Sequence, residues 1–157
     1  MADKAEAIAK LQAAHDTFRS PIADLPDGAY NETFLGTWNL SQLLAHMAGW
    51  YGEIGGGFER VGRGERPVPE GVDYNDADAW NVKFAARAQP GKAALAQFDS
   101  AYAAYVSAAE RLDASNYGVD AERGRPKIGN RLLEGAGIHH FEEHAPEVAA
   151  WLSGRKA

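Results

Sequence analysis

The segment between residues 130 and 153 places its apolar residues at intervals that fit one face of an α-helix. The intervals are 4, 3, 4, 4 and 3 residues for the series Leu133, Gly137, His140, His144, Val148 and Trp151. Residues spaced in this way form one stripe on a helix. Because the ends of the stripe are apolar, it should face a core, and both histidines should point inward. Glu142, Glu143 and Glu147 are expected to lie mostly away from it.

Three other segments show the same helical period, over residues 3–19, from residue 39 to beyond residue 54, and over residues 91–113. Asn39, with Gln42 three residues later, predicts a capped helix start. Asn130 is expected to cap the last helix and Gly154 to end it. A shorter helix is predicted over 77–88, capped by residue 75 or 76, and Pro90 is expected in the first turn of the helix that follows.

Four substantial amphipathic helices with polar connections predict an all-α protein, a four-helix bundle with an extra short helix before the third. The inward residues of the 91–113 helix are expected to be Leu95, Phe98, Tyr102, Tyr105, Val106 and Leu112. A chain of 157 residues fits one domain, so a single bundle over residues 1–157 is the prediction.

Composition narrows the function classes. The chain has no cysteine, which excludes disulfides and thiolate metal sites and suits a cytoplasmic protein. Its net charge of −6 argues against a nucleic-acid partner, and the basic cluster at 122–131 is interpreted as a solvated loop. No apolar run approaches the roughly 18 residues that would span a membrane, and no signal peptide is recognisable.

Two inward imidazoles one turn apart can grip one metal ion, or each can simply hydrogen-bond within the core. His46 favours the metal, since it borders the apolar face of the second helix, and bundles build metal sites from facing helices. His46, His140 and His144 are therefore the candidate ligands, with open positions for water or substrate. His15 is a weaker fourth candidate, and His139 is expected to face elsewhere.

Other side chains could serve such a site. Glu143 and Glu53 are candidate general bases, although a solvated carboxylate is the simpler interpretation of both. Four aromatic residues are candidates to line a pocket above the metal: Trp38, Trp50, Trp80 and Tyr51. For Trp50 and Tyr51, core packing is the simpler role.

Two motifs resemble the DinB-like superfamily. "GTWNLSQLLAHMAGW" at 36–50 is similar to its helix-2 signature, and "HHFEEHAP" at 139–146 to its helix-4 histidine pair. The branch that the chain most resembles is the ClbS/DfsB type. The resemblance implies an up-down-down-up bundle, frequent homodimers, and a divalent metal held by His46, His140 and His144. The glycines at 55–57 and Pro146 depart from the pattern, and Pro146 predicts a kink after His144.

The resemblance and the histidines leave three functions open. The first is a metal-dependent enzyme, a hydrolase or thiol-dependent transferase, acting on a small reactive or toxic molecule. The second is a protein that binds and sequesters such a molecule without turnover. The third is a bundle whose metal is structural or absent. Imidazole ligands suit zinc, nickel, copper and iron, and zinc or nickel is the expected ion.

Overall fold

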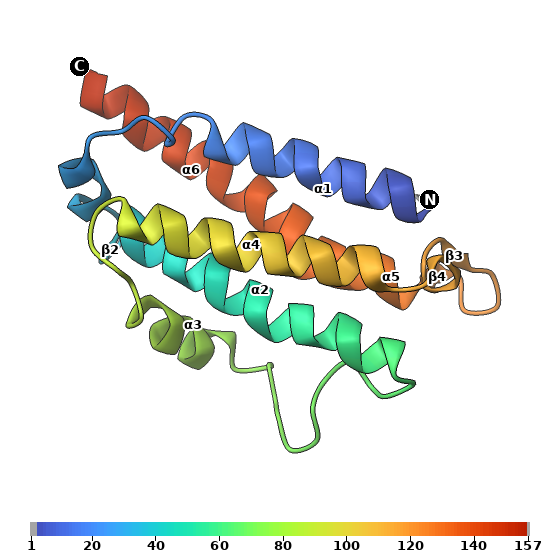
Figure 1. Ribbon diagram of the computed structural model, residues 1–157. Helices are drawn as coiled ribbons and strands as arrows, with labels where there is room; N and C mark the ends of the chain where they lie inside the picture. Colours follow the sequence, from blue (N-terminus) through green and yellow to red (C-terminus); the bar gives the residue numbers. More distant parts are fainter. Residues whose placement is uncertain (1–2, 157) are drawn as a thin grey trace.

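The computed structural model describes residues 3–156 as four long helical rods, confirming the all-α bundle (Figure 1). The rods are α1 (Lys4–Arg19), α2 (Leu40–Gly62), α4 (Ala93–Arg111) and a C-terminal run. That run joins α5 (Ile128–Leu133), the π-helical segment η3 (Glu134–Ile138) and α6 (His139–Lys156). In Figure 1, α2 and α4 run in one direction and α1 and the C-terminal run in the other, which is the up-down-down-up order.

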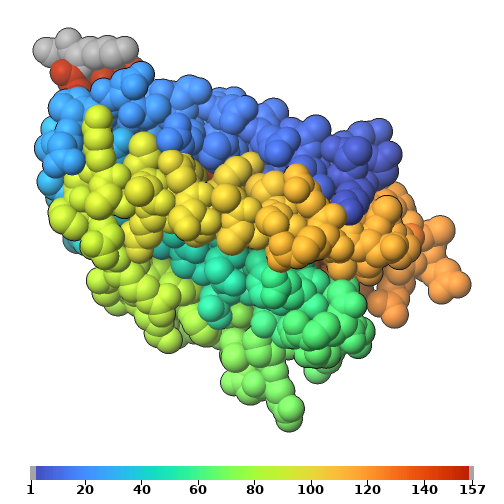
Figure 2. All heavy atoms as spheres, viewed as in Figure 1, coloured from blue at the N-terminus to red at the C-terminus, as the bar shows by residue number. Residues whose placement is uncertain are grey.

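Shorter elements occupy the connections. The short helix α3 (Ala77–Ala85) precedes α4, as predicted, with Asp76 as its cap. Two small antiparallel hairpins were not expected: β1 (Thr33–Leu35) pairs with β2 (Trp38–Asn39), and β3 (Val119–Asp120) with β4 (Arg125–Pro126). The 3-10 helices η1 (Asp27–Asn31) and η2 (Ala114–Asn116) lie beside them in the chain. Figure 2 shows α1 and α4 side by side across one face of the molecule.

The start of α2 confirms the predicted capping box. Gln42 donates its backbone N–H to Asn39 Oδ1 at 2.8 Å, and the Asn39 N–H donates to Gln42 Oε1 at 2.9 Å. The helix then continues through the glycines at 55–57 to Gly62. Glycine lowers helix propensity, but a Cβ at Gly55 would lie 3.7 Å from the Tyr105 backbone. This is an ordinary van der Waals distance, so α2 and α4 pack closely here although the contact does not require glycine.

The core lies between α2 and α4 and beneath α1. Leu95, Phe98, Tyr105 and Val106 of α4 are buried, as predicted, whereas Tyr102 is only partly buried. The aromatic rings of the core form a cluster of edge-on and tilted contacts, in which the Tyr51 ring centre lies 5.0 Å from that of Tyr105. No helix in residues 3–156 is long and apolar enough to cross a membrane.

The prediction for the start of α4 was wrong. Pro90 and Gly91 lie outside the helix, which begins at Ala93. Gly91 adopts a left-handed backbone, with φ +58°. Capping groups come from η1 instead: Asp27 Oδ1 accepts from the Lys92 N–H at 2.9 Å, and Asn31 Oδ1 from the Gly91 N–H at 3.2 Å. The cap is thus supplied by residues about 60 positions earlier in the chain.

The bounds of the last helix also differ from the prediction. Asn130 lies inside α5 rather than at its cap, and its buried side chain accepts from the Gly118 N–H at 2.7 Å. The helix passes Pro146 and Gly154 and ends at Lys156. The π-helical segment lies just before the paired histidines. A Cβ at Gly137 within it would lie 2.5 Å from Leu11 Cδ1 and 3.1 Å from the Tyr105 hydroxyl oxygen, so a larger residue would force these side chains to move.

Candidate metal site and its cavity

Three histidines meet where α2 faces α6. His46, from the second turn of α2, lies among buried apolar residues and is only 3% exposed. His140 and His144 come from the first turns of α6; His144 is buried and His140 partly buried. The stripe that the sequence predicted thus does face the core, because Leu133 and Val148 on either side of the histidines are buried, and Trp151 at its end is partly buried.

The three rings lie close enough to share one ligand. The His46 ring centre is 4.8 Å from that of His140 and 5.6 Å from that of His144, and the two α6 rings are 5.4 Å apart. One ring nitrogen from each histidine lies within 4.8 Å of those of the other two. A zinc–nitrogen bond of about 2.0–2.1 Å needs ligand nitrogens closer than this limit. Small side-chain rotations would bring them onto one ion.

Each ring also has a nitrogen that lacks a protein partner. His46 Nδ1, His140 Nδ1 and His144 Nε2 are buried and make no hydrogen bond within residues 3–156. An unsatisfied buried polar atom costs about 1–3 kcal/mol. Three such atoms on three adjacent rings would be costly in a site built only for packing. The donor set therefore fits a divalent metal ion.

The protonation states agree with this interpretation. Burial, followed by the charge of nearby His144, lowers the pKa of His46 to about 4, with Asn81 opposing. Burial, followed by the charges of His46 and His144, lowers the pKa of His140 to about 3. Both rings are therefore neutral at neutral pH, which is the form of imidazole that binds metals.

Glu147 orients one of the rings, a role that its predicted position away from the stripe did not suggest. It lies one turn after His144, and its carboxylate accepts a hydrogen bond from His144 Nδ1. This contact leaves Nε2 as the free nitrogen of His144. A carboxylate that accepts from the second nitrogen of a metal-binding histidine fixes the ring and raises its basicity. The three-residue spacing of His144 and Glu147 is the feature of the sequence from which this contact could have been predicted, because residues three apart are neighbours on a helix.

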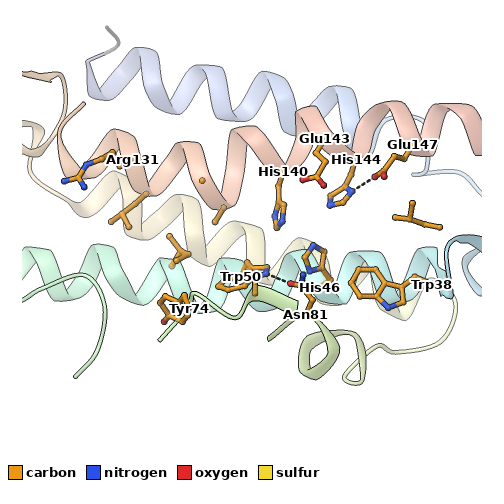
Figure 3. A pocket seen from close by; sticks show the side chains of 16 residues that line it. Trp38, His46, Trp50, Tyr74, Asn81, Arg131, His140, Glu143, His144 and Glu147 are labelled. Atoms are coloured by element: carbon orange, nitrogen blue, oxygen red, sulfur yellow. Dashed lines mark hydrogen bonds and ion pairs between the residues drawn. The ribbon is translucent and has the colours of Figure 1, made fainter. Parts of the chain in front are cut away.

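The histidines open onto a cavity of about 660 Å³. Figure 3 shows them in its middle, with Trp38 at one end and Arg131 at the other. Trp50 lines the cavity, as one interpretation of the sequence had it, and Glu143 borders it as well. Glu143 is exposed, and it remains the candidate general base.

Helix α3 supplies the wall opposite α6, and sequence reasoning missed this. Asn81 of α3 lines the cavity and accepts a hydrogen bond from Trp50 Nε1 at 2.7 Å. Tyr74, in the loop before α3, lines it too, with its ring centre 5.5 Å from that of Trp50. Tyr74 lies in a loop, and Asn81 lies in the short helix predicted over 77–88, for which no inward face was assigned, so neither was placed at the site.

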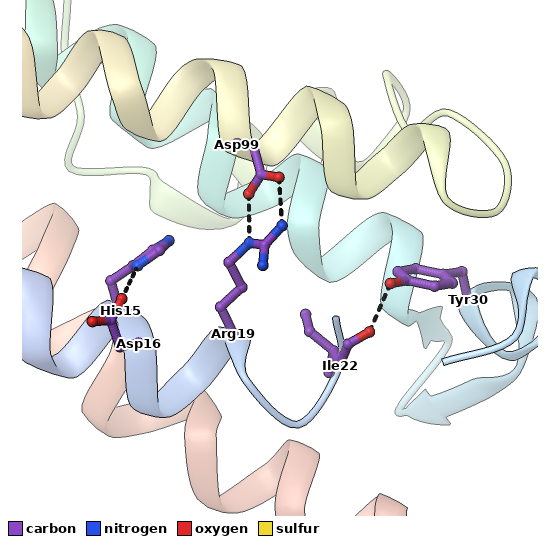
Figure 4. Close-up of polar contacts among 6 residues, drawn as sticks. All are labelled: His15, Asp16, Arg19, Ile22, Tyr30 and Asp99. Atoms are coloured by element: carbon purple, nitrogen blue, oxygen red, sulfur yellow. Dashed lines mark hydrogen bonds and ion pairs between the residues drawn. The ribbon is translucent and has the colours of Figure 1, made fainter. Parts of the chain in front are cut away.

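Several candidates lie elsewhere. His15 stacks on Tyr102 at 3.9 Å between ring centres and contacts Asp16 (Figure 4), so it is a helix-face histidine apart from the cluster. His139 faces away from the cluster, as expected; it is exposed, and its ring lies 3.1 Å from the Glu134 carboxylate. Glu53 accepts from the Tyr74 hydroxyl and does not line the cavity.

Two of the aromatic candidates are also absent from the cavity lining. Tyr51 is buried in the core, with 1% of its surface exposed. Trp80 packs against Trp50 from outside and donates its Nε1–H to the Asp73 carbonyl at 2.8 Å. Of the four aromatic residues that the sequence proposed, only Trp38 and Trp50 therefore reach the cavity.

Comparison with known proteins supports the fold. The chain resembles the colibactin self-resistance protein ClbS, solved in complex with double-stranded DNA, with a TM-score of 0.81 at 13% identity over 98% of this chain and 97% of that one. It also resembles the sibling lethal factor precursor DfsB, with a TM-score of 0.76 at 16% identity over 99% and 98%. At these identities the likeness shows the fold alone.

A third similar structure is larger. The mycothiol-dependent maleylpyruvate isomerase matches with a TM-score of 0.70 at 15% identity, over 93% of this chain but 60% of that one. No curated protein sequence matches significantly. The family model of the DinB superfamily, however, matches residues 10–145, which is most of the chain. The chain therefore belongs to the DinB superfamily.

Proposed function

We propose that the protein is a metal-dependent enzyme that acts on a small reactive or toxic molecule, as a hydrolase or a thiol-dependent transferase. One observation carries the proposal: three histidines converge from two helices on a cavity of about 660 Å³, and one nitrogen of each lies within 4.8 Å of those of the other two. His46, His140 and His144 would hold the ion. When bound, a divalent metal would acidify a water or a thiol and so supply the nucleophile at neutral pH.

The chain's own residues would prepare the reaction. Glu147 holds His144 in one orientation. Trp38 and Trp50 give the cavity apolar walls, against which the body of a substrate would pack. Glu143 is placed to accept the proton that the nucleophile loses. Zinc or nickel is the proposed ion, and a cytoplasmic homodimer that binds neither membrane nor nucleic acid is the proposed setting.

The metal assignment is tested by elemental analysis of protein purified without chelator. His46→Ala, His140→Ala and His144→Ala should each abolish metal binding while the helical circular dichroism signal survives. His139→Ala is the matched control, because it removes an exposed histidine next to His140. Full metal occupancy in any of the three site variants would refute the assignment.

Catalysis is tested separately on zinc- or nickel-loaded protein. Turnover of p-nitrophenyl acetate would indicate hydrolysis, and coupling of monochlorobimane to cysteine would indicate thiol transfer. Either activity should disappear in His46→Ala and persist in His139→Ala. Activity that is equal in both variants would contradict a reaction at the histidines.

A second candidate is a protective binding protein without turnover. The aromatic wall of Trp38, Trp50 and Tyr74 favours it, since such walls hold flat or apolar molecules without any metal. ClbS, which shares the fold, is described as a self-resistance protein. Stoichiometric binding of a compound that persists in all three histidine variants, with no turnover, would favour this function over the enzyme.

A further inference from the structure

A second cavity lies beside the first and is rich in positive charge. It has a volume of about 760 Å³ and lies between the end of α2 with its following loop and the β3–β4 hairpin. We call it the hairpin cleft. Five cationic residues line it: Arg66, Arg123, Arg125, Lys127 and Arg131. In a chain of net charge −6, such a concentration is not a consequence of overall composition.

Most of this charge is not neutralised by the protein. Two carboxylates also line the cleft, but Glu65 pairs with Arg63 outside it, and Asp120 lies 3.8 Å from Arg123. Within residues 3–156, the other four cations of the cleft form no ion pair with an acidic side chain. Like charges held together without a counter-charge repel one another, so an anion in the cleft would be stabilising.

Arg131 connects the cleft to the histidine cavity, because it lines both. Its Nε–H donates to the Pro126 carbonyl at 3.2 Å, which anchors the guanidinium and leaves the two terminal amino groups for a ligand. Burial and the neighbouring charges of Arg125 and Arg123 lower the pKa of this side chain, and the carboxylate of Asp120 opposes them in part. Guanidinium groups bind carboxylate and phosphate oxygens in a two-pronged manner.

The positions of the two sites set the length of a molecule that reaches both. Arg131 precedes His140 by nine residues on the same helical run, which corresponds to about 13 Å along the axis. Figure 3 shows Arg131 at one end of the cavity and the histidines in its middle. Between Arg131 and the histidines the cavity is lined by Leu132, Gly135 and Ala136. This part of the wall is therefore apolar and made mostly of small residues.

We infer that Arg131 and the hairpin cleft bind an anionic group, a phosphate or a carboxylate, at one end of an elongated ligand. The other end of the same ligand reaches the histidines. This inference rests on the proposed function in that it describes the molecule taken by the same cavity. A small anion is favoured over a nucleic acid because the surrounding chain carries a net negative charge, which would repel a long polyanion.

Inorganic pyrophosphate is a suitable probe for a phosphate ligand, and citrate for a carboxylate ligand. Their binding is measured by calorimetry on the full chain in the His140→Ala background, so that an anion held by a metal ion is not counted. Arg131→Gln should weaken the better probe about tenfold or more, since a hydrogen bond to a charged group contributes about 1.5–3 kcal/mol. Arg125→Gln with Lys127→Gln should weaken it further.

Arg111→Gln is the matched control, because Arg111 is exposed and pairs with Glu59 away from the cleft. It should bind both probes as the His140→Ala protein does. Circular dichroism on each variant verifies folding. Probe binding that is unchanged in Arg131→Gln, or absent from the parent protein, would overturn the inference. Short duplex DNA that binds more tightly than either probe and loses this binding in Arg131→Gln would also overturn it.

Failure of the metal proposal gives a different pattern. In that case elemental analysis would find no metal in the unmodified protein, while probe binding would still depend on Arg131. That result would uphold the anion site and refute only the metal-dependent enzyme.

Discussion

Glu147 accepts a hydrogen bond from Nδ1 of His144, one helical turn earlier, and leaves Nε2 of the same ring without a protein partner. Both residues belong to α6, so the pair is set by the helix alone and needs no other element. It fixes which nitrogen of His144 is available to a ligand. The carboxylate is half-buried, which protects this contact from competition with water.

Replacement of Glu147 by glutamine tests this relationship. The amide oxygen can still accept from His144, but it lacks the negative charge that makes the ring a stronger ligand. We expect Glu147→Gln to weaken zinc affinity about 10- to 100-fold, the usual effect of removing such a partner. Competition with a chromophoric chelator measures it. Glu142→Gln, which changes an exposed carboxylate on the same helix, should leave the affinity unchanged.

The two histidines with lowered pKa values predict how stability depends on pH in the metal-free protein. In the unfolded chain both rings take up protons near their ordinary pKa of 6.5, whereas the folded protein resists protonation down to about 4 for His46 and about 3 for His140. The unfolded state therefore binds more protons between these limits. Stability should be complete above pH 6.5 and fall as the pH drops through this window.

Urea unfolding of metal-free protein between pH 4 and pH 7 measures this loss. Each histidine should contribute a loss of about 1.4 kcal/mol per pH unit wherever only the unfolded chain holds its proton. Replacement of His140 by glutamine removes one of the two titrating rings, so the variant should lose less stability over the same range. An equal slope in the variant and the unmodified protein would show that other groups cause the acid sensitivity.

Much of the site could be predicted because the regular spacing of an α-helix shows which residues share one face. His140 and His144 share a stripe with Leu133, and that stripe stays on the core side although a π-helical segment interrupts the helix. The π-helical segment covers residues 134–138 and so spans the four-residue step from Leu133 to Gly137, which a wider turn also accommodates. His46 could be placed by the same reasoning on α2.

The remaining parts of the site depend on contacts between distant segments, which leave no local pattern. Asn130 is a good capping residue, yet its side chain binds Gly118 in the hairpin instead. Asn81 and Arg131 reach the cavity from two short helices, α3 and α5. The sequence alone suggests a solvated loop for the basic cluster at 122–131. That residues of this cluster line a cleft becomes visible only when the hairpin is folded.

The capping box of α2 offers a test of the helix that carries His46. Asn39→Ala removes the acceptor for the Gln42 N–H, and the loss of an N-cap side chain costs about 1 kcal/mol. We expect a decrease of that size in the free energy of unfolding, measured in urea. Asn39→Ser should restore most of it, since serine caps almost as well. A decrease of the same size in both variants would point to a role of Asn39 other than capping.

Gly49 controls how closely α3 approaches α2, and thus the wall of the cavity. A Cβ at this position would lie 2.1 Å from Cγ of Phe84, whose ring is buried and has no free space to enter. Gly49→Ala should therefore push α3 outward and destabilise the protein by about 1–3 kcal/mol, as overpacking usually does. Because Asn81 moves with α3, its hydrogen bond to Trp50 should break, and tryptophan fluorescence should change.

Gly52→Ala is the matched control on the same helix, since its Cβ would meet no atom within 4 Å. That substitution should instead stabilise the helix by about 0.5–1 kcal/mol. Equal stability of the two alanine variants would contradict the close packing of α3 on Gly49.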